Sequence, residues 1–166
     1  MTARTAVTAC VLGLVGALPA AAQAPSAVPN LTFTGGYAAF VDDGRIDHGA
    51  FGAGAEWVVT RHIALGPEVL YMVGPDSDRD LFVVGVARIG ILPFTSPVSP
   101  FVTAGAGLLR HSDDFYGQSF SSNEGAFIVG GGVRIAASPR VFIAPEFTLG
   151  WEPHMRFSVN VGVRVK

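Results

Sequence analysis

Large apolar side chains occupy every second position in the last stretch of the chain. Between Phe157 and Val165 they are separated by Ser158, Asn160, Gly162 and Arg164. A period of two places the apolar side chains on one face of a β-strand and the polar ones on the other. The same alternation recurs along most of the chain. It favours a closed barrel whose apolar face is turned outward, toward lipid.

Eight segments of roughly ten residues carry this alternation, a length typical of a tilted membrane strand. We expect them to begin near Leu31, Gly49, His62, Asp80, Pro100, Gly125, Arg140 and Met155. Compact connections are expected at 60–61, 93–98 and 137–139. Longer or more polar connections are expected at 41–48, 74–79 and 111–123, with a short last one at 152–154. The predicted fold is all-β: an eight-stranded antiparallel up-and-down transmembrane β-barrel. Because the short turns of such barrels face the periplasm, both termini should be periplasmic.

The N-terminus has the pattern of a cleaved signal peptide. Arg4 precedes an apolar stretch, 6–18, and small residues follow at 20–22. We predict a signal peptide at 1–22 for export through the Sec pathway, an extended leader at 23–30 and the barrel domain at 31–166. Cys10 is the only cysteine, so the exported chain should contain no disulfide.

Composition supports a membrane barrel over a soluble domain. Only 14% of residues are charged and Lys166 is the single lysine, whereas soluble domains carry about 25% charged residues. After the signal, no run approaches the roughly 20 apolar residues of a membrane helix. A membrane barrel reconciles high apolar content with short apolar runs, because its strands alternate.

The face opposite the apolar one carries few charges. It is mostly Gly, Ala, Ser and Thr, which is too sparsely charged for a water-facing surface and suits a narrow lumen. We predict an interior charge network in which carboxylates and guanidiniums are paired, acting as a structural plug; a gate or proton path is the alternative. Its predicted members are Glu56, Glu68, Arg88, Arg134, Glu146 and Arg164.

Three stretches carry a resemblance to a known family: Pro100–Leu108, Ala144–Gly150 and the closing strand Phe157–Val165. On these, the chain resembles the small eight-stranded outer-membrane β-barrels of Gram-negative bacteria, the OmpA-transmembrane-domain and OmpX-like group. The resemblance spans about residues 31–166. It implies residence in the cell outer membrane and an interior that side chains fill and that does not conduct freely.

The fifth connection is the candidate contact surface. Its aromatic and acidic residues lie among Gly and Ser, a composition suited to lipid headgroups or a partner. Outer-membrane lipid is an expected partner, and a surface ligand or lipopolysaccharide headgroups are candidates; we expect no nucleic-acid partner and a monomer. The candidate contact residues are His111, Asp113, Asp114, Phe115, Tyr116 and Phe120.

Catalytic and metal motifs are weak. The acidic run from Asp76 lacks the Gly and Glu of a calcium loop, having Leu81 and Ala87 at those positions, and the histidines show no metal spacing. His111 and Ser112 are neighbours and would point to opposite faces of a strand, which disfavours a hydrolase. We therefore predict a non-enzymatic barrel without cofactor or metal. The alternatives are a soluble periplasmic ligand-binding barrel and an outer-membrane lipid-modifying enzyme.

Overall fold

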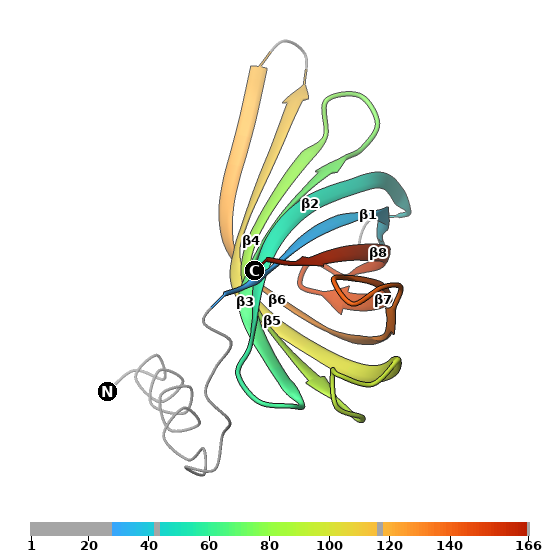
Figure 1. Cartoon of the computed structure of the whole chain (residues 1–166). Helices are drawn as coiled ribbons and strands as arrows, with labels where there is room; N and C mark the ends of the chain where they lie inside the picture. Colours follow the sequence, from blue (N-terminus) through green and yellow to red (C-terminus); the bar gives the residue numbers. More distant parts are fainter. Residues whose placement is uncertain (1–27, 42–43, 116–117, 166) are drawn as a thin grey trace, which may run out of the picture.

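The chain folds into a closed barrel of eight antiparallel strands (Figure 1). The computed structural model describes residues 28–41, 44–115 and 118–165. Each strand pairs with its sequence neighbours, and the first pairs with the last, which confirms the predicted fold class. The strands are β1 (Asn30–Phe40), β2 (Ile46–Val58), β3 (Ile63–Val73), β4 (Arg79–Gly90), β5 (Val98–Phe115), β6 (Gln118–Ala136), β7 (Val141–Gly150) and β8 (His154–Arg164).

The predicted signal peptide, 1–22, and most of the leader, 23–27, lie outside the described residues, so both stay predictions. Among the residues that are described, none forms a helix long and apolar enough to cross a bilayer.

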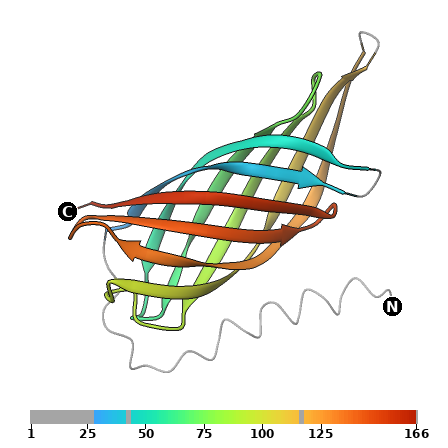
Figure 2. The same ribbon diagram turned by 90° about the vertical axis from the view of Figure 1, so that its right-hand side faces the viewer.

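Seven strands begin within three residues of their expected starts, but β6 begins at Gln118, seven residues before Gly125. The expectation of a loop at 111–123 is therefore wrong. β5 and β6 continue as a paired hairpin from Ser112↔Ser121 to Phe115↔Gln118, and this hairpin rises above the rest of the barrel (Figure 2). Apolar periodicity did not reveal it, because strands that extend beyond a membrane need no apolar face.

The two ends of the barrel differ. The turn end carries the compact connections 59–62, 91–97 and 137–140 together with the start of β1 and the end of β8. The loop end carries the connections that follow β1, β3, β5 and β7, including the tall β5–β6 hairpin.

The outer face of the barrel is apolar. In β8, Phe157 is 60% exposed and Val159 46%, whereas Asn160 on the inner face is 4% exposed. Other strands contribute further exposed apolar side chains to this belt, among them Phe33, Phe51, Leu65, Val69, Val83, Ile89, Val102, Leu108, Phe127, Val129, Ile143 and Leu149. A surface of this kind is suited to hydrocarbon and not to water.

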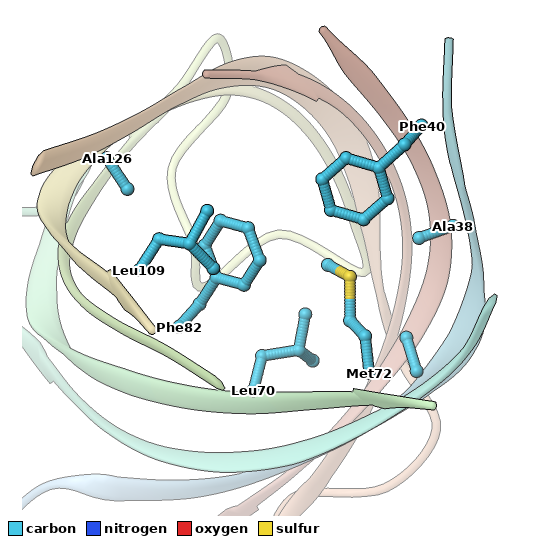
Figure 3. Packing of buried hydrophobic residues seen from close by; sticks show 8 residues of the cluster. Ala38, Phe40, Leu70, Met72, Phe82, Leu109 and Ala126 are labelled. Carbon is cyan, nitrogen blue, oxygen red and sulfur yellow. The ribbon is translucent and has the colours of Figure 1, made fainter. Parts of the chain in front are cut away.

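The interior contains more large apolar side chains than the expected lumen of small residues. Near the loop end, Phe40, Leu70, Met72, Phe82 and Leu109 point inward and pack together with small alanines (Figure 3). Near the turn end a second cluster contains Phe94, Phe101 and Phe142, with Ala64 and Ala144. These positions are spread over many strands, so counting residue types along one strand face could not predict that they pack together.

Candidate functional site

The charged interior centres on Arg88 of β4. Its Nη2 lies 2.9 Å from Glu68 Oε2 and 3.1 Å from Glu146 Oε2, and its Nη1 lies 3.6 Å from Glu56 Oε2. The three carboxylates come from β3, β7 and β2. Each of these strands places its charge on the inner face by alternation, so the barrel brings together residues far apart in sequence.

A second guanidinium holds Glu56 at the turn end. Arg134 Nη2 donates to both oxygens of Glu56, at 2.6 and 2.7 Å. The Arg134 guanidinium also lies over two rings, 4.2 Å from the centroid of Phe94 and 4.1 Å from that of Phe142. Both charged side chains are 3% exposed. Paired charge and aromatic faces together compensate the loss of water around this cation.

The third guanidinium in the network belongs to Arg156, which the sequence reasoning missed. Its Nη2 lies 3.0 Å from Glu68 Oε1, and the side chain is 2% exposed. Extending the inner-face alternation of β8 backward from Asn160 through Ser158 would have found it.

Arg164 was wrongly assigned to this interior network. It is exposed and donates to the Pro139 carbonyl at 3.2 Å. The reason is its position as the last residue of β8 at the turn end, where its side chain reaches solvent. The buried network thus contains Glu56, Glu68, Glu146, Arg88, Arg134 and Arg156.

Hydrogen bonds extend the network to the seam between β1 and β8. Asn160 Nδ2 donates to Glu146 Oε2 at 2.7 Å, and Thr34 Oγ1 donates to Asn160 Oδ1 at 2.6 Å. Asn30 Nδ2 donates to Glu56 Oε1 at 3.3 Å. Three carboxylates and three guanidiniums balance in charge. Such an arrangement ties the strands together across the lumen.

A separate cluster of histidines and aspartates lies at the loop end. His48 Nε2 is 3.0 Å from Asp78 Oδ2 and 3.3 Å from Asp80 Oδ2. His111 Nδ1 is 2.8 Å from Asp80 Oδ1 and 3.5 Å from Asp78 Oδ1. We call His48, Asp78, Asp80 and His111 the His–Asp cluster. Sequence spacing could not predict it, because the residues come from β2, the β3–β4 turn, β4 and β5.

The candidate contact residues occupy the β5–β6 hairpin. Asp113 pairs across the hairpin with Phe120, which is 56% exposed. His111 is turned toward Asp80 and so belongs to the His–Asp cluster. Asp114 and Phe115 are the last residues of β5, and Tyr116 lies outside the described residues. Beside the hairpin is a pocket of about 250 Å³ lined by Ser77, Arg79, Arg110, Ser112, Asp113, Ser119, Phe120 and Ser121.

Comparisons by sequence find nothing. No protein-family profile matches the chain, and no curated protein sequence matches it.

Comparisons by structure find small outer-membrane barrels. Neisserial surface protein A (NspA) superposes with a TM-score of 0.74 at 15% identity, covering 86% of this chain and 100% of that one. The N-terminal β-barrel domain of Pseudomonas aeruginosa OprF gives 0.63 at 9% identity, covering 82% and 97%. Ail, the attachment invasion locus protein of Yersinia pestis, solved with the heparin analogue sucrose octasulfate, gives 0.55 at 16% identity, covering 83% and 99%. The chain therefore has the fold of the small eight-stranded outer-membrane β-barrels.

Proposed function

We propose that the chain is an integral protein of the cell outer membrane, exported through the Sec pathway by a signal peptide, residues 1–22, that is then removed. The supporting observation is its reversed polarity: Phe157 is 60% exposed on the outside while Arg156, next to it, is 2% exposed inside. A soluble periplasmic carrier would have the opposite arrangement, with charge outside and apolar side chains within.

The proposed orientation places the turn end and both termini in the periplasm. Its support is the difference in connections, since outer-membrane barrels have short periplasmic turns and longer external hairpins. The β5–β6 hairpin would then stand at the cell surface.

We further propose a non-enzymatic monomer whose lumen is plugged. An eight-stranded barrel is only just wide enough for its own side chains. Arg88, Arg134 and Arg156 with their carboxylates would block the middle and turn end, and the cluster around Phe82 would block the loop end. The plug is completed by residues of one chain, which argues for a monomer.

Heat-modifiability and surface proteolysis test the barrel and its orientation together. The unheated protein should migrate differently from the boiled one on a gel. Protease added to intact cells should cut within 113–123 and spare 137–140. Cleavage only at 137–140 would invert the topology. Recovery in the periplasmic fraction without detergent would instead support a soluble carrier, and an altered lipid A mass profile would support a lipid-modifying enzyme.

The pocket beside the β5–β6 hairpin is the proposed contact site for a surface ligand. It combines the guanidiniums of Arg79 and Arg110 with serine hydroxyls and the ring of Phe120. Such groups match the phosphates and hydroxyls of lipopolysaccharide headgroups. Binding of the purified protein to lipopolysaccharide should weaken in Arg110→Gln. The matched control, Arg140→Gln at the turn end, should leave it unchanged. Equal loss of binding in both variants would mean that binding depends on net charge and not on this pocket.

A further inference from the structure

The His–Asp cluster at the loop end converges from four segments of the chain. His48 and Asp80 are almost fully buried, with side chains 1% and 2% exposed. Asp78 is 15% exposed and His111 38%. Two polar groups are thus fixed inside the barrel wall, and two lie on the side from which solvent could deliver an ion.

The donor atoms are spaced as metal ligands are. A tetrahedral zinc ion with ligands near 2.1 Å requires ligand atoms about 3.4 Å apart. His48 Nε2 lies 3.0 Å from Asp78 Oδ2 and 3.3 Å from Asp80 Oδ2. One donor atom from each of these three residues falls within a set whose members all lie within 4.8 Å of one another.

The surroundings of His48 favour its role as a ligand. Its Nδ1 lies 3.3 Å from the Ile46 carbonyl oxygen, so a hydrogen on Nδ1 can be donated there. The lone pair of Nε2 would then face the carboxylates of Asp78 and Asp80. Two carboxylates that face a nitrogen lone pair need a proton or a metal ion between them. Backbone carbonyls commonly orient metal-binding histidines in this way.

Two independent features leave a free oxygen and free space for an ion at this site. Asp78 Oδ1 is a buried oxygen without a hydrogen-bond partner. Gly74 leaves clear the space beside the ligands, because a Cβ there would lie 2.5 Å from His48 Nε2 and 3.0 Å from Asp78 Oδ2. Arg79 fixes the turn from outside the site, donating to the backbone carbonyls of Gly74 at 3.4 Å and Asp78 at 2.6 Å.

We propose that His48, Asp78 and Asp80 bind a divalent first-row transition-metal ion such as zinc, with water completing the coordination and His111 beside the site at hydrogen-bond distance from Asp80. One neutral imidazole and two carboxylates carry a charge that matches a divalent cation. Imidazole ligands favour zinc and its neighbours over calcium and magnesium, which prefer oxygen. The bound ion would tie β2, the β3–β4 turn and β4 together at the loop end. The inference does not rest on the proposed function, since the ligands are defined by the barrel alone.

Calorimetric titration with zinc chloride tests the site. The full chain, purified in detergent and stripped with a chelator, should bind one ion. His48→Gln and Asp80→Asn should each weaken binding by more than about 10- to 100-fold, the loss typical for a residue that only orients a metal ligand. His62→Gln is the matched control, since His62 lies at the turn end with its Nδ1 2.9 Å from the Gly90 carbonyl oxygen; it should bind as the wild type does. Gel mobility before and after heating verifies that each variant is folded.

Ring NMR signals of the wild-type protein provide a readout that needs no variant. Zinc should shift the signals of His48 and His111 and leave those of His62 in place. Absence of saturable binding in the wild type would overturn the proposal. Equal loss of binding in the His62 and His48 variants would overturn it as well.

Discussion

Removing one partner of the Arg134–Glu56 pair should destabilise the barrel far more than the small change in side-chain volume suggests. Arg134→Met would leave Glu56 with Arg88, whose Nη1 is 3.6 Å away, and with the amide of Asn30 at 3.3 Å. Glu56→Gln would leave the Arg134 guanidinium between two aromatic rings with no carboxylate in hydrogen-bond contact. Both changes nearly preserve side-chain volume, so the lost charge dominates.

The expected magnitudes follow from burial. Breaking one side of a buried pair typically costs about 3–5 kcal/mol, and replacing both partners can be nearly neutral. For Arg134→Met we expect roughly 3 kcal/mol, at the low end of this range, because Arg88 and Asn30 still neutralise and solvate Glu56. For Glu56→Gln the two rings retain part of the stabilisation of Arg134, since a desolvated cation–π contact contributes about 2 kcal/mol. The double variant should be several kcal/mol more stable than the sum of the singles predicts.

Denaturant unfolding in lipid vesicles, followed by gel mobility, measures these differences. Arg164→Met is the matched control, since Arg164 is exposed and should change the free energy of unfolding by no more than about 0.5 kcal/mol. Additive effects of the two substitutions, within about 0.5 kcal/mol, would refute the coupling. The carboxylate of Glu146 instead contacts Arg88 and Asn160. Substitutions of Glu146 and Arg134 should therefore be less strongly coupled in their effects on the free energy of unfolding.

Three further predictions concern packing and the lipid face. Val159→Arg, at the centre of the β8 belt, should cost about 2–4 kcal/mol in vesicles, while Val163→Arg, near its end, should cost roughly 0–1; equal costs would contradict the assigned depths. Gly36→Ala should lower stability by about 1–3 kcal/mol, because its Cβ would clash with the Phe157 carbonyl, whereas Gly35→Ala meets no atom within 4 Å and should be tolerated in the same unfolding assay. Phe82→Ala should cost about 3–5 kcal/mol and Phe120→Ala, on the exposed hairpin, less than 1; similar losses would mean that Phe82 is not packed in the interior.

The number of strands and the side of the sheet on which each side chain lies were predictable from the sequence, because both follow from local alternation. A period of two in β8 fixes which side Val159 and Asn160 face, and the closed sheet leaves only an inside and an outside. The same rule predicts from the sequence alone that Glu56, Glu68 and Glu146 lie on the inner face.

Side-chain contacts between different strands were harder to predict from the sequence. Arg164 was wrongly assigned to the interior because alternation reports a face and not a depth along the lumen, whereas Arg156 lies on the face that alternation does predict. The aromatic rings around Arg134 come from three-dimensional packing that no single strand encodes. Likewise His48 and His111 are 63 residues apart in the chain, and only the registers of β2, β3, β4 and β5 bring them to one site.

The pairing of the first strand with the last has a consequence for how the barrel forms. Asn30 lies opposite Arg164, so the sheet cannot close until almost the whole chain has been made and delivered. Closure at such sequence separation predicts slow folding, in which the ring is completed last. It also places the start of β1 and the end of β8 side by side at the turn end. A circular permutant that joins them with a short linker and opens the chain at 137–140 should rebuild the same ring with the old seam as an internal hairpin.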